Sequence, residues 1–301
     1  MILSIEQAIR KLEGKLPGRG RRPLSFLKYN TPPSGRSLGC KVIFFIFAEG
    51  AKTPSVVAKT VRAQRDADVI RSGHASVMRL NEIVRGSEFE ARFPQMLAIE
   101  EHGNGAEIFT IETACPGRKM SANDDPQKAL DFYTSFSKLV YDHVRTNGSG
   151  AESSAVSLDF EYAAKLIQGF NCTNETREAM IRYARETLKD GISLPPMPQH
   201  GDLTIDNILV DGERINIIDC DTFGRISVPG FDIFHFMRRS RMSDLVGHLE
   251  RYFREVGITC VPDKRLLFIY FLHELYIKKD YILADKPARA VMDQFESLNQ
   301  P

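Results

Sequence analysis

One segment, residues 200–219, constrains the fold of this chain more than any other part of its sequence. It opens with His-Gly-Asp, continues to Asn207, and ends on Asp219 after an apolar run. Two β-branched runs, 208–210 and 215–218, flank an Asp-Gly pair, and this pattern is typical of a β-hairpin. Because a hairpin returns the chain on itself, we expect Asn207 and Asp219 to lie near each other at its open end.

These side chains are the ones that phosphoryl transfer from a nucleotide requires. Asp202 would orient the attacking hydroxyl and accept its proton. Asn207 and Asp219 would each give an oxygen ligand to Mg²⁺, which prefers hard oxygen ligands and takes few of them from protein. Taken singly, an Asp in a loop is usually solvated and is favoured there by local hydrogen bonding. The combined spacing favours a kinase-type site with Asp202 as the catalytic residue.

At these residues the chain resembles the aminoglycoside phosphotransferase and choline kinase family, which comprises small-molecule kinases. The resemblance is carried by His-Gly-Asp-x-x-x-x-Asn and by the later Ile-Asp pair, although Cys220 stands where the family has an aromatic residue. It implies an ATP- and Mg²⁺-dependent transferase acting on an alcohol group. A Pro-x-x-Asp segment downstream is similar to one in the family, which implies that Asp232 braces the catalytic loop; a helix N-cap is the other role open to it, and the two roles are compatible.

The resemblance also implies an α+β, protein-kinase-like bilobal fold. We expect an N-terminal nucleotide-clamping lobe at 1–117, with an antiparallel sheet and one main helix, and a mostly helical C-terminal lobe at 118–301 for catalysis and acceptor binding. The local patterns agree with this division. The β-like runs lie at 22–29, 41–47, 55–61 and 106–114, and the helical patterns at 69–84, 127–145, 158–170, 175–189, 232–257, 263–282 and 287–299.

Three features of the N-terminal part are candidates for nucleotide binding. Gly35 and Gly39 lie in a turn between β-like runs that could cover phosphates with backbone N–H groups, although such a turn is alone an ordinary hairpin connection. Lys59 follows Val-Val-Ala in a strand and resembles the kinase lysine that contacts the α- and β-phosphates; the alternative is a solvent-facing strand lysine. The adenine edge would bond to backbone groups near Glu112 to Ala114.

The acidic partner that such a lysine needs is not evident from the sequence. The family places a Glu on the helix after the lysine strand. Here His74 occupies the matching position in the apolar pattern, and Glu82 is the nearest acidic residue downstream. The sequence therefore leaves this partner open.

The acceptor site is the least determined part of the prediction. Asp206, Asp221 and Glu274 are candidate substrate contacts; for Glu274 the alternative is that it lies with His273 on the exposed stripe of an amphipathic helix. The resemblance admits an amino alcohol, an aminoglycoside, a sugar or a glycan precursor as acceptor, with a slight preference for a sugar or glycan. The rival functions are a protein kinase and a catalytically inactive nucleotide-binding pseudokinase.

Composition excludes several other classes of protein. The net charge of +1 gives no general attraction to nucleic acid or membranes. No apolar stretch reaches the roughly 20 residues that span a bilayer. The five cysteines contain no Cys-x-x-Cys pair, which favours reduced thiols and argues against a zinc site. We therefore expect a cytoplasmic enzyme, monomeric or homodimeric, whose partner is a small molecule.

Overall fold

The chain forms two compact units. The computed structural model describes residues 2–12, 23–30, 41–103, 107–147 and 155–277, together with 286, 288 and 289. The N-terminal unit comprises Met1–Ser121 and Asp206–Phe223, and the helical unit comprises Ala122–Ile205 and Gly224–Pro301. The segment 206–223, which the sequence analysis assigned to the C-terminal lobe, thus groups with the N-terminal unit. The reason is that its hairpin pairs with a strand of that unit.

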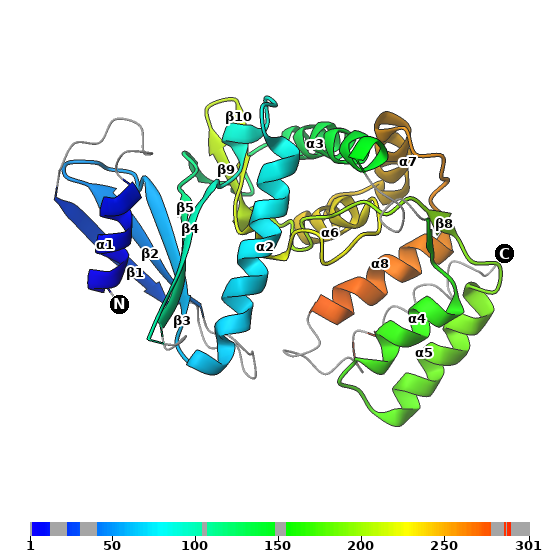
Figure 1. Cartoon of the computed structure of the whole chain (residues 1–301). Coiled ribbons are helices and arrows are strands. Elements are labelled where there is room, and N and C mark those ends of the chain that lie inside the picture. The colour runs from blue at the N-terminus through cyan, green and yellow to red at the C-terminus, as the bar shows by residue number, and fades with distance from the viewer. Residues whose placement is uncertain are drawn as a thin grey trace. The chain divides into compact units, whose positions relative to one another are not determined.

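The N-terminal unit is built on a five-stranded antiparallel sheet with the order β1-β2-β3-β5-β4 (Figure 1). All four predicted β-like runs form strands of this sheet. The remaining strand, β4, was not predicted. Its Glu-Glu-His ending weakens the apolar signal, and pairing with β5 compensates for it. The strands are β1 (Leu24–Asn30), β2 (Lys41–Ala48), β3 (Val56–Val61), β4 (Met96–His102) and β5 (Glu107–Thr113).

The two faces of this sheet are covered by different helices. Helix α1 (Ile2–Leu12) packs its apolar stripe against alternate residues of the central strands, among them Phe44, Ala58 and Ile111, in one buried cluster. Helix α2 (Ala67–Val84) packs near the opposite face, where Ile70 clusters with buried apolar residues of β3 and β5. Because side chains alternate along a strand, the residues between those of the first face point towards the second. Lys59 is one of these.

A second, three-stranded sheet in this unit carries the predicted hairpin. Strand β9 (Ile208–Asp211) pairs with β10 (Arg214–Ile217) on one side and with β6 (Arg118–Lys119) on the other. The two-residue connection begins with Gly212 at φ 60°, the positive φ that such tight hairpin turns require. The hairpin prediction is therefore confirmed.

The helical unit contains the predicted helices and one additional break. The predicted helical stretch 232–257 is divided into two helices, because Arg241 and Asp244 both adopt left-handed backbone conformations (φ 53° and 56°). The predicted extension 278–282 and most of 287–299 lie outside the described residues. The helices are α3 (Pro126–Asn147), α4 (Phe160–Gln168), α5 (Asn174–Thr187), α6 (Phe231–Ser240), α7 (Leu245–Val256) and α8 (Lys264–Ile277), with β7 (Val156–Ser157) and β8 (Ser193–Leu194) as a short ladder.

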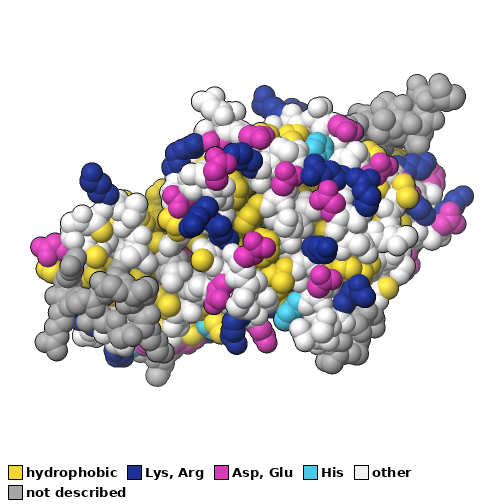
Figure 2. Space-filling view, turned by 90° about the horizontal axis from the view of Figure 1, so that it is seen from above, with side chains coloured by type: hydrophobic (Ala, Val, Ile, Leu, Met, Phe, Trp, Pro, Cys, Tyr) yellow, Lys and Arg dark blue, Asp and Glu magenta, His cyan; other side chains and the backbone are white. Residues whose placement is uncertain are grey.

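The surface agrees with the balanced charge of the chain. On the face drawn in Figure 2, basic side chains (dark blue) and acidic side chains (magenta) are interspersed. Within the described part of the chain, none of the helices has the length and apolar character needed to cross a bilayer.

Candidate active site

The open end of the β9–β10 hairpin brings the two predicted metal ligands to one place in the N-terminal unit. Ile208 pairs with Ile217, and the Ile218 N–H donates to the Asn207 carbonyl at 2.9 Å. Asn207 therefore accepts the last hydrogen bond of the hairpin, and Asp219 directly follows the donor of that bond. Asp219 has φ 58° and ψ 48°, a left-handed conformation that few residues other than glycine adopt. This conformation ends the strand and starts the short turn Cys220–Thr222.

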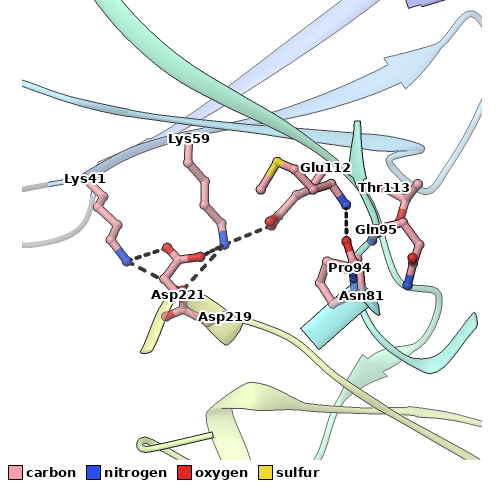
Figure 3. Close-up of polar contacts among 10 residues, drawn as sticks. Lys41, Lys59, Asn81, Pro94, Gln95, Glu112, Thr113, Asp219 and Asp221 are labelled. Atoms are coloured by element: carbon pink, nitrogen blue, oxygen red, sulfur yellow. Dashed lines mark hydrogen bonds and ion pairs between the residues drawn. The ribbon is translucent and has the colours of Figure 1, made fainter. Parts of the chain in front are cut away.

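Five charged side chains of the same unit form what we call the lysine cluster: Lys41, Lys59, Glu112, Asp219 and Asp221 (Figure 3). Lys59 Nζ lies 2.9 Å from Glu112 Oε1, 2.9 Å from Asp221 Oδ1 and 3.6 Å from Asp219 Oδ1. Lys41 Nζ lies 2.6 Å from Asp221 Oδ2 and 3.8 Å from Asp219 Oδ1. Two ammonium groups and a predicted metal ligand therefore converge on one small volume.

Strand register is what places the two lysines and Glu112 together. Lys59 pairs with Ile43 on β2 and with Thr110 on β5. Lys41 and Glu112 are each two residues from those partners, so both are diagonal neighbours of Lys59 on the same face of the sheet. The predicted alternative of a solvent-facing lysine is wrong, because Lys59 is only 5% exposed.

Charge balance within the lysine cluster shifts the pKa values of its members. Burial opposes ionisation of Asp221, but the charges of Lys59 and Lys41 outweigh burial and hold the pKa of Asp221 below its ordinary value. Burial raises the pKa of Glu112 to about 7, with Lys59 acting in the opposite direction. Three carboxylates share two lysines, so a proton on the deeply buried Glu112 relieves the excess negative charge. The pKa of Lys59 is raised despite burial, because its carboxylate partners stabilise the ammonium.

The structure answers which residue is the acidic partner of Lys59. Neither His74 nor Glu82 takes that role; the ion pairs of Lys59 are with Glu112 and with aspartates of the hairpin end. Helix α2 instead approaches through Gly73, where an added Cβ would lie 3.2 Å from both Cβ and Cγ of Asp221. The helix therefore contributes a close backbone approach in place of a carboxylate.

The predicted adenine-binding segment is tied into the sheet by its own N–H groups. Thr113 N–H donates to the Gln95 carbonyl at 2.9 Å and Ala114 N–H donates to the Ser55 carbonyl at 3.2 Å. Asn81 of α2 bonds to the chain on both sides of Gln95 (Figure 3), which fixes the start of β4. The Ala114 N–H is thus already engaged, and Glu112 contributes its side chain to Lys59. Gly35 and Gly39 lie outside the described residues.

In the helical unit, Asp232 supports the loop that carries Asp202. Its carboxylate accepts hydrogen bonds from the N–H groups of His200 (2.6 Å) and Gly201 (2.9 Å), and from the Tyr133 hydroxyl. Gly201 has φ 86°, a conformation that glycine adopts without steric cost. The bracing role is confirmed, and the N-cap role is wrong because Gly230 is the N-cap of α6.

Asp202 itself belongs to a series of contacts that we call the histidine chain: Asp202, His235, Glu274 and Arg238. His235 Nε2 lies 3.5 Å from Asp202 Oδ1, and His235 Nδ1 lies 2.8 Å from Glu274 Oε1. Arg238 Nε lies 3.4 Å from Glu274 Oε2. Burial opposes the charge of Asp202, but the nearby His235 and other positive charge outweigh burial and lower the pKa of the carboxyl group.

The three candidate acceptor contacts have different environments. Asp206 is exposed, 3.6 Å from Lys119 Nζ. Asp221 does not point towards solvent; it bridges the two lysines of the lysine cluster. Glu274 is 5% exposed, as His273 is 4% exposed, so the predicted exposed stripe is wrong.

Sequence reasoning missed two functional candidates, Lys41 and His235. The signal for Lys41 was its position two residues before Ile43, which places it on the Lys59 face once the strand register is known. The signal for His235 was that a histidine follows Asp232 by about one helical turn, in a segment whose other residues are apolar. Neither signal identifies a role without the contacts.

Comparison with known proteins agrees with this geometry. The family model described as "Phosphotransferase enzyme family" matches residues 78–265, more than half of the chain. The chain therefore belongs to this phosphotransferase enzyme family, and the prediction of a phosphotransferase is confirmed. No curated protein matches the chain by sequence.

Solved structures show the same fold at low sequence identity. One is APH(2")-IIia in complex with GDP and kanamycin, 14% identical over 98% of this chain and 99% of that one, with a TM-score of 0.59. A thermostable mutant of aminoglycoside phosphotransferase APH(4)-Ia, in a ternary complex with ADP and hygromycin B, is 13% identical over 96% and 97%, with a TM-score of 0.57. APH(3'')-Id from Streptomyces rimosus, with ADP and streptomycin, is 14% identical over 92% and 98%, with a TM-score of 0.51. The predicted α+β, protein-kinase-like fold is confirmed.

Proposed function

We propose that this chain transfers the γ-phosphate of ATP to a hydroxyl group of a small molecule. The observation that carries the proposal is the lysine cluster, in which Lys59 is buried and within 3.6 Å of Asp219. A lysine is almost never buried without paired charges. A cluster of two lysines next to a hairpin end with oxygen ligands suits a metal-bound polyphosphate.

The N-terminal unit supplies the nucleotide-binding groups. Lys59 and Lys41 neutralise phosphate oxygens, and Glu112 and Asp221 hold the two ammonium groups in place. The donors at the hairpin end fit Mg²⁺, because Asn207 and Asp219 offer hard oxygens and the Asp219 side chain is 45% exposed. When bound, the ion would neutralise charge on the phosphates.

The helical unit supplies the group that acts on the acceptor. Asp202 accepts a hydrogen bond from the acceptor hydroxyl and orients its oxygen for in-line attack on the γ-phosphorus. Because the transition state of phosphoryl transfer is loose, most of the rate comes from positioning and charge neutralisation. His200 supports the loop, since its Nδ1 accepts from the Asp202 N–H at 3.3 Å.

The pairing of the candidate acceptor contacts favours a neutral hydroxylated acceptor, such as a sugar or glycan precursor, over a polycation. A site for an aminoglycoside would need carboxylates that are not already paired with protein cations. Glu274 is neutralised by His235 and Arg238, and Asp221 is paired with two lysines. Of the three candidate acceptor contacts, only Asp206 is exposed.

The catalytic assignment is tested by Asp202→Asn and Asp219→Asn, with Asp211→Asn as a matched control on the same hairpin. ATP consumption with Mg²⁺ is measured against a panel of sugars, amino alcohols and aminoglycosides, with GTP as a second donor. We expect each of the first two variants to lose activity by at least about 10³-fold, on the order of 4 kcal/mol of transition-state stabilisation. The control should stay within about twofold of wild type on the same scale. Wild-type turnover in either catalytic variant would refute the proposal.

The acceptor class is tested with matched pairs of neutral sugars and their amino analogues. Each pair differs by one ammonium group. If the neutral member is preferred by roughly tenfold in kcat/KM, about 1.4 kcal/mol, the charge argument holds. A preference for the amino member, increasing with the number of amino groups, would contradict it.

A further inference from the structure

His235 is a buried titratable residue that the proposed phosphoryl transfer does not yet use. It lies on α6, is 0% exposed, and has carboxylate oxygens near both of its ring nitrogens. The Nδ1–Glu274 Oε1 contact of 2.8 Å is a normal hydrogen bond. The Nε2 atom is buried without a hydrogen bond and lies 3.5 Å from Asp202 Oδ1. A buried polar atom of this kind requires an explanation.

The chemistry of the neighbours favours a ring that is protonated at both nitrogens. An ionised carboxylate only accepts hydrogen bonds, so a ring that faces carboxylates at both nitrogens is satisfied by donating from both. Such a ring would be an imidazolium, and the histidine chain would then carry two negative charges, on Asp202 and Glu274, and two positive charges, on His235 and Arg238. These four charges would sum to zero. Burial acts against the imidazolium, but the nearby carboxylates of Asp202 and Glu274 outweigh burial, and the pKa of His235 is raised.

The packing around the ring limits its movement. The Phe231 ring stacks on His235 with centroids 5.6 Å apart and an interplanar angle of 15°. Glu274 is held from its other oxygen by Arg238, which also lies over the Phe234 and Phe271 rings. The ring therefore cannot rotate freely about its Cβ–Cγ bond, and its Nε2–H bond has a fixed direction.

We propose that His235 is a positioning residue. Its Nε2–H attracts Oδ1 of Asp202 and so sets the orientation of the catalytic carboxylate. Glu274 acts behind it by holding the ring and balancing its charge. This inference rests on the proposed function, in which Asp202 orients the acceptor hydroxyl. It assigns Glu274 to this support and not to the acceptor. The rival explanation is that His235 only joins α6 to α8 as part of the core.

Two near-isosteric substitutions separate these explanations. The amide nitrogen of His235→Asn takes the place of Nδ1, so it keeps the Glu274 bond and loses the Asp202 contact. The amide nitrogen of His235→Gln takes the place of Nε2, so it keeps the Asp202 contact and loses the Glu274 bond. His143→Asn on α3 is the control for a histidine substitution outside the histidine chain.

The assay is Mg²⁺-dependent ATP hydrolysis, with water as the hydroxyl acceptor, together with thermal unfolding of each variant. We expect His235→Asn to lower kcat at least roughly tenfold while KM for ATP stays within about twofold and the unfolding temperature changes little. We expect His235→Gln to retain kcat within about threefold and to have the larger drop in unfolding temperature. If the variant with the larger drop in unfolding temperature also has the larger drop in kcat, His235 has only a structural role and the proposal is overturned.

A second measurement does not depend on turnover or on the fold of the His235 variants. ¹⁵N spectra of histidine-labelled protein should show one imidazole protonated at both nitrogens at neutral pH. Asp202→Asn should shift its Nε2 signal and leave the signals of the other histidines unchanged, apart from His200. A neutral His235, or one insensitive to Asp202→Asn, overturns the inference. A wild-type chain without turnover on any acceptor would instead count against the proposed function.

Discussion

The lysine cluster and the histidine chain bury opposite charges in two different ways. In the lysine cluster, neighbouring strands deliver two lysines and a glutamate to one sheet face, and three carboxylates share two cations. In the histidine chain, a loop and two helices supply four groups whose charges balance. The first arrangement has one carboxylate more than it has lysines, and the proposed Mg²⁺ would offset this excess. The charges of the second sum to zero over its four groups, which suits a part that only orients a carboxylate.

The largest effect that would test this difference is expected for Lys59→Met. Removing the ammonium leaves Glu112 and Asp221 buried without their shared partner. Breaking a buried ion pair from one side costs about 3–5 kcal/mol of the free energy of unfolding. Chemical denaturation measures this loss, and the double variant Lys59→Met/Glu112→Gln should recover part of it. A loss below about 1 kcal/mol would show that the cluster is open to water.

A pH profile is the next test, and it concerns Glu112. Its pKa is raised from 4.5 to about 7 in the folded protein, so the folded state binds this proton more tightly than the unfolded state. Glu112 therefore contributes stability at low pH that is lost as the pH rises from about 4.5 through about 7. Denaturation between these pH values should give a less negative slope for Glu112→Gln than for wild type. Parallel curves would contradict the charge-excess interpretation.

Gly73→Ala should have a smaller effect with an unusual sign. Replacing glycine by alanine inside a helix usually stabilises it by roughly 0.5–1 kcal/mol. Here the new Cβ would lie 3.2 Å from Asp221, whose carboxylate is held by two lysines and so cannot move away easily. We expect a net loss of about 1 kcal/mol, within the range of mild overpacking, and a higher KM for ATP. The exposed neighbour Ser72→Ala serves as the control, and a stabilised Gly73→Ala would show that Asp221 can shift.

Arg238→Gln should give the smallest change. Its side chain is 39% exposed, and exposed or half-exposed ion pairs contribute less than about 1 kcal/mol. A glutamine can still donate one hydrogen bond to Glu274. We therefore expect an unfolding free energy close to wild type by urea titration. A loss comparable to that of Lys59→Met would contradict this expectation and show that the fold depends on the charge of Arg238.

The comparison also explains what the sequence could predict. The hairpin end with Asn207 and Asp219 was predictable, because its signals are local: two apolar runs and a turn pair within a few residues. Glu112 as the Lys59 partner was not, because it depends on pairing between strands more than fifty residues apart. The His235–Glu274 contact depends on how two helices pack, which no local pattern encodes. The break after α6 was missed because Arg241, where the helix ends, is not a residue that usually marks a left-handed turn.

The backbone at Asp219 has a consequence for anyone who engineers this chain. A left-handed conformation is free of steric cost only for glycine. If stability of the folded state were the only criterion, glycine would therefore be favoured at this position. Directed evolution that selects only for thermal stability would therefore tend to replace Asp219 and to enrich stable variants without activity. A library built on this scaffold needs a parallel selection for turnover, or a fixed codon at position 219.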